Sequence, residues 1–229
     1  DVQTIQTMMK RMEDNFDHRF WTGSSYRSPD YKGESDDRGN ALAVVSGLAS
    51  KDKYPALKTL LTTEYHASPY MEKYVLEALF CMDATDEALD RIRKRYKTMV
   101  EYPGLTTLPE NWIDETKQLK PGEPMINAFW GTYNHGWSGG PLTLLSQKVC
   151  GIEPTSPGFR TFRIRPQMGY LKQASCHVSS VSGEISVNIQ RKGKKLQIDV
   201  TVPSGTTAEV VFPSGKTKTL QSGTHSVRG

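Results

Sequence analysis

The sequence predicts a mainly α plus β chain, in which a helical region is followed by an antiparallel β-sandwich. Apolar side chains recur at steps of three and four up to residue 151, and beyond it they alternate with polar ones. The formal charge changes at the same place, from 18 basic and 21 acidic residues before it to 11 basic and 4 acidic after it. We therefore expect two domains, 1–151 and 152–229.

The helical region should contain six helices. Acidic Asp36 and Asp37 oppose the positive end of a helix dipole, and Pro55 and Pro69 suit first turns, while Gly151 is a typical helix stop. The expected helices are 2–16, 39–49, 54–64, 70–82, a segment opening at Thr85, and about 140–150. Since most connections are short, these helices should form antiparallel hairpins.

Two surfaces of these helices can be assigned from the pattern. The first helix should carry an apolar stripe at Val2, Ile5, Met9, Met12 and Phe16. The helix that opens at Thr85 should expose a solvated basic face, formed by Arg91, Arg93, Lys94, Arg95 and Lys97.

The strands follow from alternation and from evenly spaced turns. Apolar side chains alternate along 162–166, 185–189 and 196–202. Turn dipeptides recur about every ten residues, as expected for an antiparallel sandwich, at Ser182-Gly183, Lys192-Gly193, Ser204-Gly205, Ser214-Gly215 and Ser222-Gly223.

Composition excludes several classes of protein. With 36% hydrophobic residues and a mean hydropathy of -0.55, the chain is typical of a soluble globular protein and not of a disordered one. Nothing approaches the roughly 18 apolar residues of a membrane helix, and no signal peptide is evident. Because the first residue is Asp1, we expect a piece of a longer chain.

Metal, cofactor and nucleic-acid binding are not expected. Cys81, Cys150 and Cys176 are too widely spaced for a zinc site or a disulfide framework, so we expect small buried hydrophobes. The basic residues 191–195 surround Gly193, which favours a solvated turn over a nucleic-acid contact. Phosphate-loop, HExxH and CxxC motifs are absent, and 136–140 does not match a serine-hydrolase elbow.

One long connection has the features of a binding site. Residues 102–137 lack helical periodicity, and a connection longer than about 12 to 15 residues in a compact domain is usually functional or disordered. Its aromatic residues argue against disorder: Trp112, Phe129, Trp130, Tyr133 and Trp137. Carboxylates beside aromatic rings suit sugar chemistry, because rings stack on pyranose faces and carboxylates supply acid and base.

The candidate acid, base and binding residues are Asp36, Asp37, Glu72, Glu110, Asp114, Glu115 and His135. Glu72, in a first helical turn, has a structural explanation. Glu110 has none, since neither capping nor an i,i+4 pair accounts for it, and a functional role and a structural role stay equally open. From the residues alone, His135 reads more readily as a structural histidine than as a functional one.

Several motifs together resemble the C-terminal part of bacterial α-L-rhamnosidases of glycoside hydrolase family 78. They are Asp36-Asp-Arg-Gly-Asn-Ala-Leu-Ala, Ala67-Ser-Pro-Tyr-Met-Glu-Lys-Tyr, Thr106-Thr-Leu-Pro-Glu-Asn-Trp, Asn134-His-Gly-Trp-Ser-Gly-Gly-Pro and Gly151-Ile-Glu-Pro-Thr-Ser-Pro. The resemblance covers nearly the whole chain. Two features depart from the common pattern: Pro109 stands where an aromatic residue is usual, and an insertion runs from Lys117 to Phe129.

The resemblance implies the C-terminal half of a six-hairpin α/α toroid followed by a β-sandwich, and inverting hydrolysis of terminal α-L-rhamnosyl linkages. It implies Glu110 as general base and His135 as a pocket residue, with Trp112, Trp137 and Asn134 contacting the sugar. A toroid needs twelve helices and this chain offers six, so the general acid is expected in a missing N-terminal half. The separate chain should then be inactive.

The resemblance implies two partners, a rhamnose-containing glycan or glycoside and the missing N-terminal half of the enzyme. Binding to nucleic acid or to a membrane is not expected. The resemblance implies that the protein is located in the bacterial periplasm or is secreted, with the cytoplasm as the alternative. Two other functions remain open. One is a non-catalytic carbohydrate-binding or structural module, and the other is a different α/α-toroid glycosidase or a phosphorolytic relative.

Overall fold

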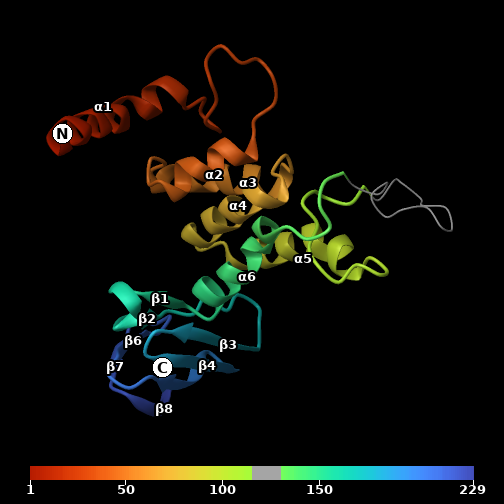
Figure 1. Cartoon of the computed structure of the whole chain (residues 1–229). Coiled ribbons are helices and arrows are strands. Elements are labelled where there is room, and N and C mark those ends of the chain that lie inside the picture. The colour runs from red at the N-terminus through yellow and green to blue at the C-terminus, as the bar shows by residue number, and fades with distance from the viewer. Residues whose placement is uncertain (115–129) are drawn as a thin grey trace. The chain divides into compact units, whose positions relative to one another are not determined.

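A computed structural model describes residues 1–114 and 130–229, and these form two compact units, Asp1–Gly140 and Pro141–Gly229. Six α-helices lie in the described residues, as predicted (Figure 1). They are α1 (Val2–Phe20), α2 (Asp37–Val45), α3 (Tyr54–Thr63), α4 (Pro69–Cys81), α5 (Thr85–Glu101) and α6 (Gly140–Leu144). The domain boundary between residues 151 and 152 stays a prediction.

Local capping explains where three of these helices begin, and Asp1 caps α1. Asp36 caps α2 by accepting a hydrogen bond from the backbone of Arg38, and Ser68 caps α4 just before Pro69. The last helix differs from its prediction, because α6 passes into a π turn over Leu145–Val149. Gly151 then takes a positive φ of 78°, as expected for a helix stop.

The core of the first unit lies among α2, α3, α4 and α5. Each of these helices contributes buried apolar side chains. This burial of one face explains the helical spacing of apolar residues in the sequence. Their buried apolar side chains include Ala41, Val44, Leu57, Leu61, Val75, Leu76, Leu79, Phe80, Ala88 and Met99.

Helix α1 has no buried residue, although its apolar stripe forms as predicted. Its first three turns leave Val2, Ile5, Met9 and Met12 between 54% and 71% exposed. Only its last turns pack, where the Phe16 and Phe20 rings lie 5.3 Å apart. The described residues therefore leave the stripe uncovered.

The basic face of α5 is only partly solvated, so this prediction was wrong in part. Arg93, Lys94 and Lys97 are exposed as expected, but Arg91 is 3% exposed and Arg95 is partly buried. The reason is that buried carboxylates on α2 and α4 meet the arginines, which a run of charge on one helix cannot reveal.

The second unit contains two four-stranded sheets. One has the order β1 (Ile152–Pro154), β2 (Thr161–Ile164), β6 (Thr207–Val211), β7 (Thr217–Leu220). The other has the order β3 (Gln173–Ser180), β4 (Gly183–Lys192), β5 (Lys195–Val202), β8 (Gly223–Arg228). Alternate residues along β4 and β5 are buried, which confirms the period-two pattern.

One strand pair departs from the antiparallel prediction. Strands β2 and β6 pair in parallel, with Phe162 opposite Ala208, while the other pairs are antiparallel. Since β3, β4 and β5 intervene in the chain, no hairpin joins β2 to β6 and no turn signal fixes their direction. The predicted turns are confirmed, because the glycines at 183, 193, 205, 215 and 223 all have positive φ.

The cysteine prediction holds for Cys150 alone. Cys150 is buried, and burial, followed by the charge of the Cys176 thiol and a hydrogen bond between the two free thiols, raises the pKa of the Cys150 thiol to about 12. Cys176 is partly buried, whereas Cys81 is exposed because it ends α4 on the solvent side. Among the described helices, none is both long and apolar enough to cross a membrane.

Candidate active site

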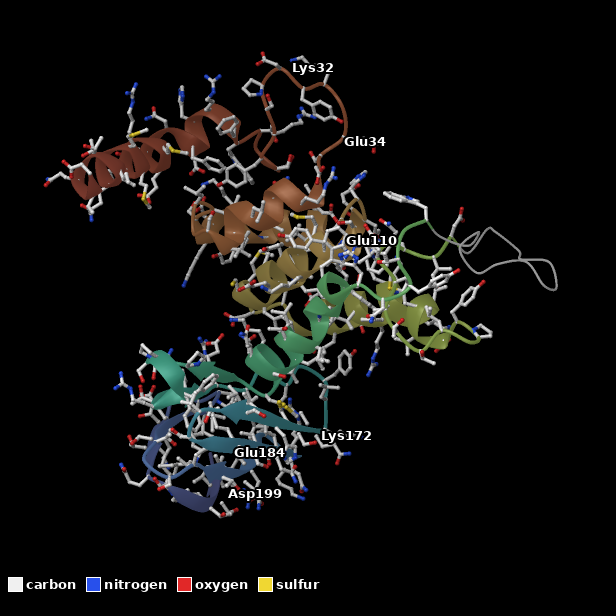
Figure 2. All side chains as sticks on the ribbon, in the orientation of Figure 1. Lys32, Glu34, Glu110, Lys172, Glu184 and Asp199 are labelled. Atoms are coloured by element: carbon white, nitrogen blue, oxygen red, sulfur yellow. The ribbon has the colours of Figure 1, made fainter. Side chains whose placement is uncertain are left out.

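Two segments that flank residues 115–129 pair with each other and hold Glu110 between them. The Glu110 backbone N–H donates to the carbonyl oxygen of Thr132 at 2.9 Å. The Thr132 backbone N–H donates in turn to the Glu110 Oε2 atom at 3.0 Å. Alongside, the Asn111 side chain donates to the Trp130 carbonyl oxygen at 2.9 Å. The loop thus fixes both the backbone and one carboxylate oxygen of Glu110. Figure 2 marks the place of this side chain.

The turn at 136–139 is fastened to the same loop. The His135 backbone N–H donates to the Leu108 carbonyl oxygen at 2.9 Å. The hydroxyl of buried Ser138 donates to the Pro109 carbonyl oxygen at 2.7 Å. Because a buried hydroxyl needs a partner, Ser138 is a firm anchor for this turn. The segments that carry Glu110 and His135 are therefore held side by side.

The Glu110 carboxylate and the His135 ring face each other across a short gap. Glu110 Oε2 lies 3.7 Å from His135 Nδ1, and the two side chains are 20% and 33% exposed. Gly131 allows this approach, since its φ is 109° and a Cβ there would lie 2.7 Å from Glu110 Oε2. Two predicted site residues thus come together, partly sheltered from water.

The aromatic ring of Trp137 adjoins this pair. The Trp137 ring lies 4.1 Å from the His135 ring and 5.3 Å from the Tyr70 ring, measured between centroids. Trp137 remains 41% exposed, and Tyr133 is 42% and Trp130 75% exposed. Asn134 is exposed in the same segment. Exposed rings beside polar groups can stack on the CH face of a sugar.

Trp112 lies in a packed environment. Its indole N–H donates to the Ala67 carbonyl oxygen at 2.8 Å, and its ring lies 5.1 Å from that of Tyr96. The Arg95 guanidinium stands 4.1 Å from the ring centroid. These contacts anchor the loop two residues after Glu110, and a sugar contact by Trp112 stays a prediction.

Two other candidate carboxylates are occupied elsewhere. Asp37 and Glu72 are fully buried, and both bind Arg91, at 2.7 Å and 2.6 Å respectively. Burial opposes the charge of Arg91, but the bonds and charges of Glu72 and Asp37 prevail and raise the pKa of Arg91 above its usual value. The three charges therefore form a structural network of the helical core.

The remaining candidates lie outside this arrangement. Asp36 caps α2 and binds the Arg38 side chain at 2.9 Å, which lowers the pKa of Asp36. Asp114 is exposed at the end of the described segment. Glu115, Phe129 and the predicted insertion from Lys117 lie outside the described residues. In the described part of the chain, no group of three or more His, Cys, Asp or Glu side chains could hold a metal ion.

Thr132 and Gly131 were not identified from the sequence. Thr132 contacts both Glu110 and His135, and Gly131 makes room for the carboxylate. No spacing rule links a threonine to a glutamate 22 residues earlier. The positive φ of Gly131 arises where two loop segments pair, which the sequence does not reveal. Only the nearness of Gly131 to Asn134 and His135 in the sequence could have drawn attention to it.

Comparison with known proteins finds similar sequences. Residues 151–227 match the family model of the bacterial alpha-L-rhamnosidase C-terminal domain. An alpha-L-rhamnosidase of Formosa agariphila is 26% identical over 192 residues, which are 79% of this chain and 20% of the relative. This chain thus spans about a fifth of that relative's length.

Two solved structures share the fold. The crystal structure of Streptomyces avermitilis alpha-L-rhamnosidase complexed with L-rhamnose has a TM-score of 0.78 at 21% identity, over 100% of this chain and 24% of that one. The GH78 family rhamnosidase of Bacillus sp. GL1 has a TM-score of 0.73 at 21% identity, over 93% and 23%. The sequence and structure comparisons therefore support a C-terminal fragment of an alpha-L-rhamnosidase.

Proposed function

We propose that this chain is the C-terminal part of an α-L-rhamnosidase that cleaves terminal α-L-rhamnosyl linkages with inversion, and that Glu110 is its general base. The observation that carries the proposal is the Glu110 carboxylate, which the loop holds beside His135 with partial shelter from water. Exposed Trp137 adjoins the pair and supplies a surface for the sugar ring.

The chemistry assigned to Glu110 is activation of water. Thr132 binds the Oε2 atom, so we assign the attacking water to Oε1. As the water oxygen bonds to the anomeric carbon, Glu110 takes its proton, and a general acid protonates the departing glycosidic oxygen. In an inverting enzyme the two carboxyl groups stand roughly 6.5 to 9.5 Å apart, which leaves space for that water.

The general acid is assigned to an N-terminal half of the enzyme. Asp37 and Glu72 are unsuitable, because both are buried against Arg91 and are needed to balance its charge. The uncovered apolar stripe of α1 supports further helices packing on it, since an exposed apolar stripe usually marks a contact surface. We infer that these helices complete a six-hairpin α/α toroid, and that residues 1–229 alone do not turn over substrate.

Further assignments complete the proposal. Asn134, Trp137 and His135 contact the rhamnose of a glycan or glycoside. The catalytic part is 1–151, and the two sheets of 152–229 form a β-sandwich. The alternating burial of β4 and β5 supports two sheets that share a core. The enzyme acts in the bacterial periplasm or outside the cell.

The test is hydrolysis of an aryl α-L-rhamnoside by the complete polypeptide that carries these residues. Glu110→Gln should lower kcat by about 10²- to 10⁴-fold, the usual contribution of acid–base catalysis. Glu101→Gln, a surface change at the end of α5, is the matched control and should leave kcat unchanged. NMR of the first product should show β-L-rhamnose.

The alternatives give different results in the same assay. A non-catalytic carbohydrate-binding module would release no rhamnose at all, with or without Glu110. A different glycosidase would prefer glucosides or fucosides, and a phosphorolytic enzyme would require phosphate. A retained rate in Glu110→Gln would refute Glu110 as the base.

A further inference from the structure

One hydroxyl group stands between the two polar side chains of the candidate site. The Thr132 Oγ1 atom lies 3.3 Å from Glu110 Oε2 and 2.9 Å from His135 Nδ1. The direct distance between Glu110 Oε2 and His135 Nδ1 is longer, 3.7 Å. Each contact of the hydroxyl is therefore shorter than the direct distance between the carboxylate and the imidazole.

The direction of these hydrogen bonds follows from what each group can donate. An ionised carboxylate only accepts, so the contact between Thr132 and Glu110 is a hydrogen bond only when the hydroxyl gives its one hydrogen to Glu110. The hydroxyl oxygen can then only accept from His135, which requires a hydrogen on Nδ1. The neutral imidazole consequently leaves its Nε2 atom as an acceptor. A solvated histidine favours the opposite tautomer, with the hydrogen on Nε2.

The loop backbone holds Thr132 in this place. Its backbone N–H donates to Glu110 Oε2 at 3.0 Å, so the residue binds one carboxylate oxygen with both of its donors. Its carbonyl oxygen accepts from the Glu110 backbone at 2.9 Å. Gly131, just before it, lets the carboxylate approach the loop backbone. These three contacts with Glu110 hold Thr132 in place and restrict rotation of its hydroxyl about χ1.

We propose that Thr132 is a positioning residue, which orients the Glu110 carboxylate and holds neutral His135 in the Nδ1–H tautomer. Its importance for catalysis rests on the proposed function: His135 would accept a hydrogen bond from a sugar hydroxyl at Nε2, while Glu110 keeps Oε1 for water. The tautomer itself is a property of residues 1–229 and does not depend on rhamnoside cleavage.

The test reads the tautomer directly. Two-bond ¹H–¹⁵N NMR spectra of uniformly ¹⁵N-labelled 229-residue chain, recorded above the titration range of histidine, distinguish protonated from unprotonated ring nitrogens. The chain has five histidines, and His135→Asn assigns the signal of interest by its loss. In the unaltered chain we expect Nδ1 of His135 to carry the hydrogen. A predominant Nε2–H form would overturn the proposal.

Paired variants isolate the hydroxyl. Thr132→Val keeps the shape without the hydroxyl and should shift His135 towards the Nε2–H form, whereas Thr132→Ser should keep Nδ1–H. Thr107→Val is the matched control, because that hydroxyl binds the Tyr133 carbonyl oxygen of the same loop and contacts neither Glu110 nor His135. If the tautomer of His135 is unchanged in Thr132→Val, direct contact with Glu110 determines the tautomer. That result would refute the proposed role of the Thr132 hydroxyl.

Kinetics of the complete polypeptide separate this proposal from the proposed function. Thr132→Val should lower kcat about tenfold with little change in KM, and Thr132→Ser should restore most of the rate. If Glu110→Gln abolishes activity but Thr132→Val leaves the tautomer of His135 unchanged, only the positioning role of Thr132 is refuted. If Thr132→Val shifts the tautomer of His135 but Glu110→Gln keeps full activity, Glu110 is not the base. The contact of Thr132 with His135 is then structural.

Discussion

The indole N–H of Trp137 donates to the backbone carbonyl oxygen of Glu110 at 3.2 Å. This bond ties the exposed ring that could receive a sugar to the residue that carries the candidate base. A change at Trp137 can therefore act in two ways, by removing the stacking surface or by loosening the loop, and the two effects can be separated.

Replacing Trp137 should weaken substrate binding more than the chemical step. Trp137→Ala removes the ring and should raise KM about tenfold, equivalent to about 1.4 kcal/mol. Trp137→Phe keeps a stacking face but loses the bond to Glu110, so its KM should change less than that of the alanine variant. Steady-state kinetics of the complete polypeptide on an aryl α-L-rhamnoside checks this. Equal effects of the two variants would argue against stacking.

A methyl group at Gly131 should displace the Glu110 carboxylate. The added Cβ would lie 2.7 Å from Glu110 Oε2 and 3.0 Å from Asn111 Nδ2, so the carboxylate must move. Since a misplacement of about 1 Å can cost about 10²-fold in rate, Gly131→Ala should lower kcat by that order. Gly47→Ala is the control, because it strains a similar positive φ with nothing within 4 Å. Equal kcat values for the two variants would contradict the prediction.

Removing Arg91 should destabilise the first unit strongly. Arg91→Met leaves Asp37 buried without its countercharge and leaves Glu72 only the longer pair with Arg95 at 3.5 Å. Breaking a buried ion pair costs about 3–5 kcal/mol in the free energy of unfolding. Lys97→Met breaks an exposed pair with Glu101 and should cost less than about 1 kcal/mol. Urea unfolding followed by circular dichroism compares them. Similar losses in both variants would show that the buried network contributes little.

Acid should loosen the end of α1 through Asp17. Burial works to raise the pKa of Asp17, but hydrogen bonds from Lys53 and Tyr26, each 2.6 Å long, outweigh burial and hold that pKa below its usual value of 3.8. Because the folded-state pKa is the lower one, the stabilisation is complete above the unfolded pKa and is lost as pH falls through the folded value. We expect no change from pH 7 to 5 and loosening below about pH 4.

Amide NMR shifts of residues 2–20 follow that loosening as the pH is lowered. Asp17→Asn should show a loosened helix end already at pH 7, with little further change on acidification. If the variant keeps the profile of the unaltered chain, other carboxylates and not Asp17 control the acid response.

Much of the helical order could be predicted because its signals are local. Ser68 before Pro69 and Asp36 before α2 mark helix starts within a few residues, and Gly151 marks a stop. The parallel pairing of β2 with β6 and the burial of Arg91 could not be predicted in this way. Both depend on partners more than 15 residues away in the chain, which no periodicity reports.

The same distinction applies to the candidate site. Glu110 and His135 could be singled out because a long aromatic loop carries them, and the structure brings them within 3.7 Å. Thr132 was missed because its importance arises only when residues 22 positions apart pair with each other. Asp37 stayed a candidate, and Glu72 already had a structural explanation, before the structure showed that both bind Arg91.

The most direct test of Glu110 as an inverting base is azide rescue of Glu110→Ala in the complete polypeptide, with an aryl α-L-rhamnoside as substrate. We predict a loss of about 10²- to 10⁴-fold in kcat, partly restored by sodium azide as the azide ion enters the space of the carboxylate and attacks the anomeric carbon. The product should be β-L-rhamnosyl azide. A variant that keeps the original rate, or an azide product of α configuration, would contradict the assignment.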